Sequence, residues 1–197
     1  MEQETGAIIL AGGKNSRMAG EDKAFLEVEG RPIILRIIGT LKPLVKEIII
    51  VTNTPEKYDN FKVKLVRDES PGMGPLMGIY SGLKASSCEH NFITACDTPF
   101  LSAALIEYMI KIRDNYDLLA PRIEGKYHPL FALYGKNCLS VIRKALEEGR
   151  LNVRGIFPEL NCRFISRQEA ERFDKDLLSL TNINTRLELE KARGTKA

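Results

Sequence analysis

Short β-branched runs alternate with longer amphipathic stretches along the chain, and this rhythm constrains the fold more than any other feature of the sequence. Strand-length runs separated by helix-length segments are typical of β-α units, which build a largely parallel sheet. Several runs are apolar at every position, as strands are when helices cover both faces of their sheet. The sequence therefore predicts a doubly wound α/β domain.

Seven strands and five helices are expected. The predicted strands cover residues 7–10, 47–52, 63–66, 92–95, 117–120, 130–134 and 163–166. The predicted helices cover residues 32–44, 75–86, 102–115, 136–148 and 185–192. Ser102 and Thr185 stand where helix N-caps are expected, and Pro32 suits a first helical turn. Ligands of such sheets bind at the carboxyl ends of the strands, near the point where the strand order reverses.

The length of 197 residues suits one domain that spans residues 1–197, with residues 193–197 as a frayed polar tail. A chain of this size buries well over half of its unfolded surface, so it needs no disulfide or structural metal. Four cysteines show no C-x-x-C pairing, and there are two histidines, which argues against a Cys/His metal site. Reduced thiols in a reducing compartment are expected.

The composition also limits the partners. The N-terminus is acidic, its first apolar run is only a strand long, and no stretch approaches membrane-spanning length, so we expect a cytoplasmic protein without a membrane segment. The net charge of +3 does not imply nucleic-acid binding, and no basic stripe or aromatic platform stands out. A small positive balance suits an anionic small substrate if the charges gather on one face.

A glycine-rich loop follows the first predicted strand. Gly12 and Gly13 come directly after the strand, and adjacent glycines let the backbone approach a bulky ligand with its N–H groups exposed. The same loop carries groups that suit a triphosphate. Positive charge comes from Lys14, Arg17 and Lys23, and a hydroxyl donor comes from Ser16. The spacing matches neither G-x-G-x-x-G nor G-x-x-x-x-G-K-[ST]. A turn that merely needs glycine has the same composition.

Two aspartates follow other predicted strands. Asp97 comes after the run 92–95 and before Pro99, which stiffens its turn. A carboxylate at a strand end can hold Mg²⁺, which phosphoryl and nucleotidyl transfer need to screen the phosphates. Asp68 follows the run 63–66 and precedes a Gly- and Pro-rich segment that could clamp a nucleobase or ribose. Turn formation or capping explains either aspartate equally well when it is taken alone.

Three polar residues in the second half of the chain are further candidates. His128 precedes Pro129 and is therefore not expected in a helix. A lone histidine is more often a structural hydrogen-bonding residue than a catalyst. Asn182 and Asn184 alternate along an extended stretch, so both amides point to one side, either toward a polar ligand or to cap the last helix.

Taken together, these motifs resemble the molybdenum cofactor guanylyltransferase family. The resemblance runs from about residue 6 to residue 192 and rests on order and spacing, since single motifs are shared with other nucleotidyltransferases. Its motifs are Leu10-Ala11-Gly12-Gly13, Ser16-Arg17-Met18, Asp22-Lys23, Gly74-Pro75-Leu76-Met77-Gly78, Cys96-Asp97-Thr98-Pro99-Phe100, His128-Pro129 and Asn182-Ile183-Asn184-Thr185.

The resemblance implies a three-layer Rossmann-like nucleotidyltransferase fold, with a mostly parallel twisted sheet and helices on both faces. It implies transfer of GMP from GTP to the terminal phosphate of Mo-molybdopterin, with release of pyrophosphate and with Mg²⁺ or, in its place, Mn²⁺. Transient contacts with other proteins of the molybdenum cofactor pathway are expected from the family.

The resemblance also assigns roles to individual residues. Leu10, Ala11 and Gly12 would contact the nucleotide through their backbone, and Gly13 and Arg17 would lie against the phosphates. Lys23 would neutralise the triphosphate, Asp68 would help to hold the nucleoside, and Asp97 would bind the metal ion. Arg17, Lys23 and Asp97 form the expected catalytic set, and Asn182, Asn184 and His128 are the candidates for the pterin side.

Two alternatives stay open on the sequence. One is a cytidylyltransferase that acts on the same pterin or on another small phosphate, because base choice rests on a few hydrogen bonds that the sequence does not display. The other is a nucleotide-binding module without catalysis. The presence of Lys23 and Asp97 beside the glycine loop argues against the second alternative.

Overall fold

The protein is described here from a computed structural model, which defines residues 4–12, 22–183, 188 and 190. Its strands are β1 (Thr5–Leu10), β2 (Glu27–Val28), β3 (Arg31–Pro32), β4 (Glu47–Val51), β5 (Lys64–Val66), β6 (His90–Ala95), β7 (Leu118–Ile123), β8 (Lys126–Tyr127), β9 (Phe131–Gly135) and β10 (Cys162–Ile165). Its α-helices are α1 (Ile33–Leu41), α2 (Gly74–Ala85), α3 (Ala103–Lys111), α4 (Cys138–Glu147) and α5 (Arg167–Ala170). Its 3₁₀ helices are η1 (Lys23–Phe25), η2 (Pro55–Lys57), η3 (Asp59–Phe61), η4 (Val153–Glu159) and η5 (Leu178–Leu180).

The main sheet is mixed but mostly parallel, as the sequence predicted. Its strand order is β10-β7-β9-β6-β1-β4-β5, and β8 pairs with β7 beside this path. β1 pairs in parallel with both β4 and β6, and β4 pairs in parallel with β5. β9 runs antiparallel to β6 and β7. The chain passes from β1 to β4 and β5 and then returns to β6 on the other side of β1, so the strand order reverses between β1 and β6.

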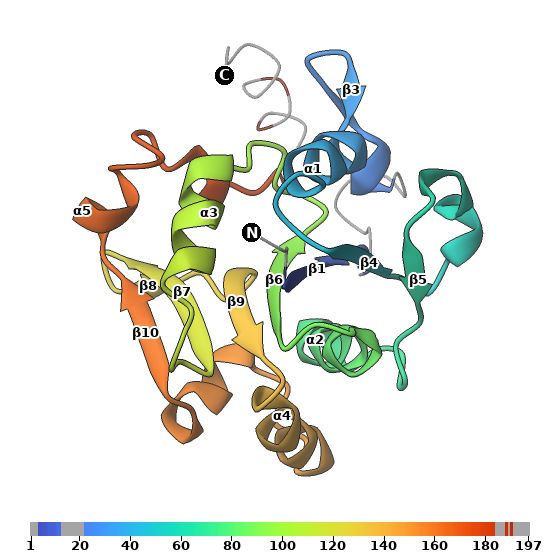
Figure 1. The fold of residues 1–197 in the computed structure, drawn as a ribbon. Helices are drawn as coiled ribbons and strands as arrows, with labels where there is room; N and C mark the ends of the chain where they lie inside the picture. The colour runs from blue at the N-terminus through green and yellow to red at the C-terminus, as the bar shows by residue number, and fades with distance from the viewer. Residues whose placement is uncertain (1–3, 13–21, 184–187, 189, 191–197) are drawn as a thin grey trace.

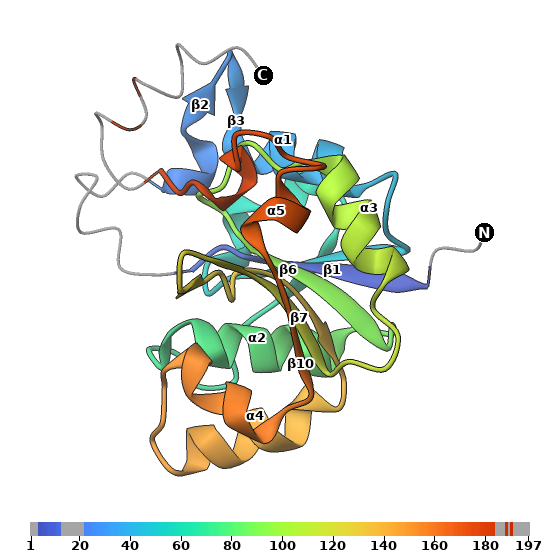
Figure 2. The same ribbon diagram turned by 90° about the vertical axis from the view of Figure 1, so that its left-hand side faces the viewer.

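Helices cover both faces of this sheet (Figure 1). α1, α3 and α5 lie on one face, and α2 and α4 lie on the other, so Figure 2 shows the sheet between two helical layers. The alternation along β1 serves both layers, because Ala7 and Ile9 pack toward α1 while Ile8 and Leu10 pack toward α2. All six residues of β1 are buried. Their apolar run is therefore the one expected of a central strand covered on both faces.

The helix boundaries follow capping chemistry in part. The Ser102 side chain accepts a hydrogen bond from the Leu105 amide at 3.2 Å and caps α3, as predicted. Pro32 does not lie in the first turn of α1, because it belongs to β3 and occupies the position before the helix. The expected cap Thr185 and most of the helix predicted at 185–192 lie outside the described residues.

A short hairpin before α1 was not predicted. β2 and β3 pair antiparallel over two residues each, and the two residues between them, Glu29 and Gly30, both have positive φ, at 51° and 72°. Two-residue hairpin loops favour this backbone conformation because its twist matches that of the strands. The hairpin stands beside α1 at the edge of the molecule (Figures 1 and 2).

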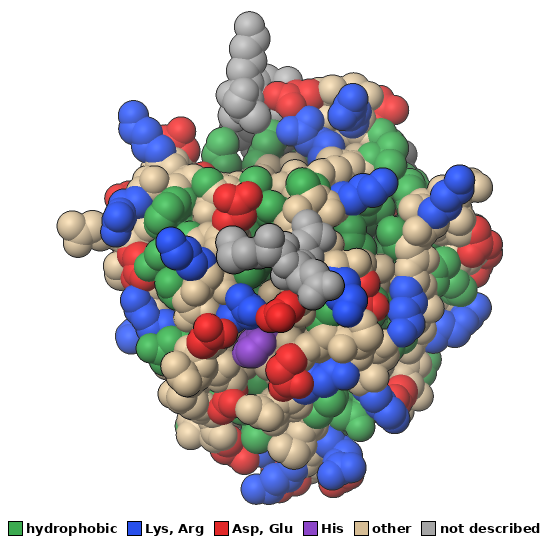
Figure 3. All heavy atoms as spheres, in the orientation of Figure 1, with side chains coloured by type: hydrophobic (Ala, Val, Ile, Leu, Met, Phe, Trp, Pro, Cys, Tyr) green, Lys and Arg blue, Asp and Glu red, His purple; other side chains and the backbone are tan. Residues whose placement is uncertain are grey.

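Charged side chains of both signs are mixed on the surface. On the face shown in Figure 3, Lys and Arg alternate with Asp and Glu, and the described residues there form no stripe of one sign. Exposed ion pairs such as Lys84–Glu69 and Arg167–Glu124 are part of this pattern. In the described part of the chain, no helix has the length and apolarity needed to cross a bilayer. The four cysteines are unpaired thiols.

Two helical glycines test how tightly the layers pack. A methyl group on Gly82 would lie 2.6 Å from Cγ2 of Ile8, whereas one on Gly39 would have no neighbour within 4 Å among the described residues. We expect Gly82→Ala to lower the free energy of unfolding by about 1–3 kcal/mol through overpacking. Gly39→Ala should raise it by about 0.5–1 kcal/mol through helix propensity. Urea unfolding of both variants measures the difference, and equal effects would contradict this description of the α2–β1 interface.

Candidate functional site

The carboxyl ends of four adjacent strands carry the candidate residues. Asp97 follows β6, the segment Leu10–Gly12 ends β1, Asn53 follows β4, and Asp68 follows β5. The parallel pairing continues past the strand ends, because the Ala11 amide donates to the Val51 carbonyl at 2.9 Å and the Cys96 amide donates to the Leu10 carbonyl at 3.1 Å. These bonds hold the end of β1 between its two neighbours, at the point where the strand order reverses.

Lys23 and Asp97 meet across this point. Nζ of Lys23 lies 3.4 Å from Oδ2 of Asp97, although 74 residues separate them in the sequence. The two side chains are only 18% and 14% exposed, so the pair is largely shielded from water. The sequence placed both residues in the catalytic set, and the structure brings them together.

Asp97 is poised for a ligand. Its Oδ1 atom is buried and has no hydrogen-bond partner in the described part of the chain. Burial raises the pKa of the Asp97 carboxyl, and the neighbouring Lys23 ammonium opposes that rise. A buried carboxylate oxygen without a partner is costly for a protein to keep, which is why such atoms gather at functional sites.

The turn that carries Asp97 is fixed on two sides. The Asp97 carbonyl accepts a hydrogen bond from the Ile183 amide at 2.8 Å. Nε of Arg36, on α1, donates to the Pro99 carbonyl at 3.3 Å, and the guanidinium lies over the Phe100 ring at 5.5 Å from its centroid. The backbone of the turn that carries Asp97 is therefore held by α1 and by the Ile183 amide.

Asp68 is oriented by a partner that the sequence analysis missed. Nδ2 of Asn53 donates to Oδ2 of Asp68 at 2.9 Å, and the Asp68 amide donates to Oδ1 of Asn53 at 3.3 Å. The other carboxylate oxygen, Oδ1 of Asp68, is buried and has no hydrogen-bond partner among the described residues. Asn53 stands in a polar run directly after a buried strand, which is the signal that could have identified it.

The end of β1 is partly exposed. Leu10 and Ala11 are buried, while Gly12 is exposed, and a methyl group on Gly12 would meet no described residue within 4 Å. Gly13 and Arg17 lie outside the described residues.

One of the candidates from the second half of the chain, His128, lies at a cavity of about 470 Å³. His128 lines this cavity, and Thr181 lies on its wall two residues before Ile183, which contacts Asp97. The full lining is Ile123, Glu124, Lys126, His128, Asp176, Leu177, Leu180 and Thr181. Burial and the nearby Lys126 lower the pKa of His128, which favours the neutral form of its ring. Asn182 is exposed, and Asn184 lies outside the described residues.

Comparison with known proteins identifies the family of this chain. The family model of the MobA-like NTP transferase domain matches residues 7–163. A molybdenum cofactor guanylyltransferase of Desulfosudis oleivorans is 41% identical over 193 residues, which are 98% of this chain and 95% of that protein. The chain belongs to the molybdenum cofactor guanylyltransferase family. It is therefore a nucleotidyltransferase.

Solved structures share the fold. The molybdopterin-guanine dinucleotide biosynthesis protein A of Archaeoglobus fulgidus superimposes with a TM-score of 0.83 at 22% identity, over 96% of this chain and 97% of that one. A nucleotidyl transferase from Methanothermobacter superimposes with a TM-score of 0.72 at 18% identity, over 98% and 97% of the two chains. The predicted Rossmann-like architecture is confirmed by these neighbours.

The ion pair makes a prediction about pH. Lys23→Met removes the ammonium that opposes the rise, so the pKa of Asp97 should rise further, as carboxyl ¹³C NMR on the nucleotide-free protein would measure. A carboxyl whose pKa is higher in the folded state contributes stability below its unfolded pKa of about 3.9 and loses it as pH rises through the folded pKa. In Lys23→Met, the stability contributed by protonated Asp97 should therefore persist to a higher pH than in the parent protein before it is lost.

Lys57→Met is the matched control for this titration, because its ammonium faces Asp22 at 3.5 Å rather than Asp97. It should leave the pKa of Asp97 where it is. An Asp97 pKa that stays constant or falls in Lys23→Met would show that the ion pair does not act on this carboxyl.

Proposed function

We propose that this protein transfers GMP from GTP to the terminal phosphate of Mo-molybdopterin and releases pyrophosphate. The observation that carries the proposal is the pair of Lys23 and Asp97 at the strand-order reversal, with Oδ1 of Asp97 buried and unpartnered. Metal-assisted transfer of a nucleotidyl group requires a carboxylate oxygen that can bind the metal ion and a cation that neutralises phosphate charge, and this pair offers both. The name of the Desulfosudis oleivorans relative supports the choice of substrates.

Asp97 fits a magnesium ion. In nucleotide sites Mg²⁺ binds through one or two carboxylates and completes its shell with substrate phosphates and water, so one available carboxylate oxygen suits it, and Mn²⁺ accepts the same ligands. When bound, the ion would screen the negative charge of the triphosphate. Lys23 would then exchange its contact with Asp97 for the phosphate oxygens, and Arg17 would add a second cation.

The rest of the nucleotide has matching groups along the same edge. Leu10, Ala11 and Gly12 would contact the nucleotide through their backbone, and Gly13 would lie against the phosphates; the exposure of Gly12 at the end of β1 supports a contact there. Oδ1 of Asp68, held in place through Asn53, is an acceptor for the hydroxyl or N–H groups of a nucleoside. The nucleoside would thus lie toward β4 and β5, and the phosphates would lie toward β6.

Catalysis needs no nucleophilic side chain in this scheme. A phosphate oxygen of the pterin substrate attacks the α-phosphorus of GTP in line, a P–O bond forms, and the bond to pyrophosphate breaks. The chain contributes alignment of the two substrates, the cation Lys23, and exclusion of water from the buried carboxylate.

The pterin substrate would occupy the cavity beside His128. Leu177 and Leu180 give the cavity apolar surface, Asp176 provides an acceptor for the N–H groups of a pterin, and Lys126 provides a cation. Continuity through Thr181 to Ile183 and Asp97 supports this assignment, because the acceptor phosphate must reach the metal-bound nucleotide. Asn182 and Asn184 belong to the same segment. Such a reaction, with unpaired thiols, suits a cytoplasmic enzyme that receives its pterin from other proteins of the pathway.

Pyrophosphate release from each of the four nucleoside triphosphates, with Mg²⁺ and with or without molybdopterin, tests the proposal. We expect release from GTP, and only when the pterin is added. Release from CTP instead would establish the cytidylyltransferase alternative with the same mechanism. Binding of GTP without release would favour the non-catalytic module.

Asp97→Ala is the variant that tests the metal assignment in this assay. Because one available carboxylate oxygen is removed from the reacting centre, we expect turnover to fall by at least about a hundredfold, as for the loss of other preorganised electrostatic groups, while GTP binding changes less. Normal turnover by this variant would remove Asp97 from the mechanism.

A second variant tests the pterin side. His128→Asn should raise the KM for the pterin substrate about three- to tenfold and leave the Kd for GTP unchanged, since one hydrogen bond is worth about 1 kcal/mol. His90→Asn is the matched control, because His90 begins β6 at the opposite end of the sheet. A changed GTP affinity in His128→Asn, or an equal effect of both variants on the pterin KM, would contradict the assignment.

A further inference from the structure

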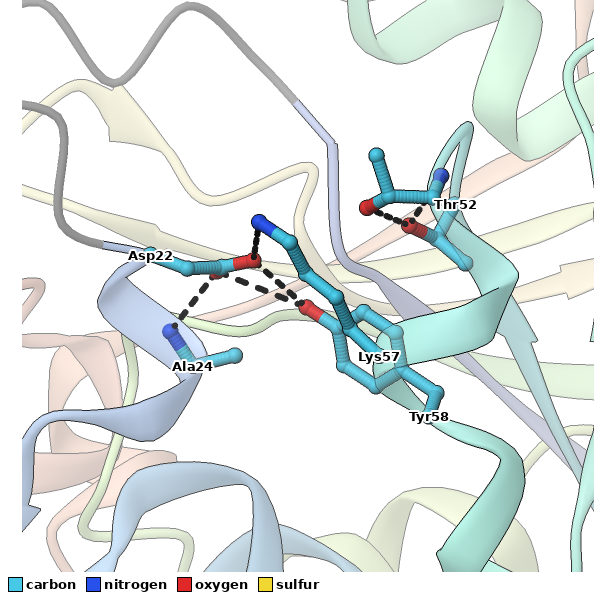
Figure 4. Close-up of polar contacts among 6 residues, drawn as sticks. Asp22, Ala24, Thr52, Lys57 and Tyr58 are labelled. Carbon is cyan, nitrogen blue, oxygen red and sulfur yellow. Dashed lines mark hydrogen bonds and ion pairs between the residues drawn. The ribbon is translucent and has the colours of Figure 1, made fainter.

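Tyr58 makes a contact that the nucleotide site does not explain. The residue follows η2 and is wholly buried, and its hydroxyl oxygen lies 3.4 and 3.3 Å from the two carboxylate oxygens of Asp22. Figure 4 shows the hydroxyl pointing at this carboxylate, 36 residues away in the sequence. Burial, with Asp22 beside it, raises the pKa of Tyr58 far above its ordinary value, so the phenol stays protonated and donates.

Asp22 uses both of its carboxylate oxygens within the protein. Oδ1 accepts a hydrogen bond from the Ala24 amide at 3.3 Å and thereby caps η1. Oδ2 lies 3.5 Å from Nζ of Lys57. The carboxylate therefore links two segments, η1 on one side and residues 57–58 on the other (Figure 4).

Lys23 is the first residue of the helix that Asp22 caps. η1 has three residues, and a single 3₁₀ turn is too short to hold its own conformation. The direction of the Lys23 side chain toward Asp97 therefore depends on what fixes the start of η1. The hydrogen bond from Tyr58 is a partly buried polar contact that fixes it, beside the more exposed ion pair of Lys57 with Asp22.

Aromatic packing accompanies this hydrogen bond. The Phe25 ring lies 5.2 Å from the Tyr58 ring and 6.2 Å from the Phe61 ring, measured between centroids. These contacts hold the far end of η1 against the connection between β4 and β5. They use the ring of Tyr58 and leave the hydroxyl as a separate element, so the two contributions can be separated by experiment.

We propose that Tyr58 is a positioning residue for nucleotide binding, which acts through Asp22 to aim Lys23 at the phosphates. The proposal rests on the function given above, in which Lys23 neutralises the triphosphate. Tyr58 itself does not touch the substrate. Its hydroxyl donates a hydrogen bond to the Asp22 carboxylate. This bond fixes the start of η1 and thereby the position of the Lys23 ammonium at the β1–β6 boundary.

The first test needs no nucleotide. Tyr58→Phe keeps the ring and removes the hydroxyl, so we expect Lys23 to leave its contact with Asp97 more often and to react faster in reductive methylation, by about threefold or more for a lost contact of about 1 kcal/mol. Mass spectrometry of the peptide that contains Lys23 measures the rate. Tyr108→Phe is the matched control, because its hydroxyl also donates to a carboxylate, that of Glu169, but lies on α3.

The second test uses the equilibrium affinity for MgGTP. Tyr58→Phe should raise the Kd about three- to tenfold, and Tyr108→Phe should leave the Kd unchanged. In a Lys23→Met background the same substitution should have almost no effect on the Kd, because the residue through which it acts is gone. Asp22→Asn should reproduce the phenotype of Tyr58→Phe.

Several results would overturn the proposal. Lys23 methylation at the parental rate in Tyr58→Phe would show that the hydroxyl does not fix Lys23. An undiminished effect on the Kd in the Lys23→Met background would show that Tyr58 acts through general stability. Failure of the proposed function is visible separately, as absent pyrophosphate release by the parent protein, and it leaves the methylation result intact.

Discussion

The parallel pairing of β1 with both β4 and β6 is the constraint on which the site depends. Parallel strands end at the same edge of a sheet, so residues that follow them meet without further adjustment. Here the pairing extends past the strands through the amides of Ala11 and Cys96, and this fixes the spacing between the end of β1 and the turn that holds Asp97. The apolar residues of β1 and the geometry of the site are thus one requirement, because a shift in register would break the bond between Leu10 and Cys96 beside the turn that carries Asp97.

Stability and function oppose each other at Asp97. An ionised carboxylate in a shielded position lowers the stability of the folded protein unless a partner compensates for its lost hydration. Lys23 compensates at one oxygen, and the remaining oxygen stays without a partner among the described residues. A site of this kind is stabilised when a cationic ligand binds to it, so binding of the metal-bound nucleotide should also strengthen the fold.

Much of the fold followed from the sequence, because central strands must be apolar on both faces and their helices must be amphipathic. β1, β4 and β6 were predicted within two residues of their observed ends for this reason. The β2–β3 hairpin was missed because two-residue strands carry no periodicity, and its Glu29-Gly30 loop is a weak turn signal.

The site could be predicted only in part. The contact between Lys23 and Asp97 is a matter of distance across the sheet, which sequence motifs indicate only through the family resemblance. The sequence analysis did not identify Asn53 and Tyr58, because a polar residue after a strand and an aromatic residue near the core usually have structural roles.

Three aspartates follow or flank the same strand ends, and the use of their oxygens separates their roles. Asp68 and Asp97 each have one oxygen held by a neighbour, Asn53 or Lys23, and one buried oxygen left without a partner in the described chain. Asp22 has both oxygens occupied by protein donors. A carboxylate with one oriented and one available oxygen is prepared for a ligand, whereas a fully occupied carboxylate holds structure together. Asp22 and Lys23 are neighbours in one motif, yet the first is a fixed support and the second is the group that it supports.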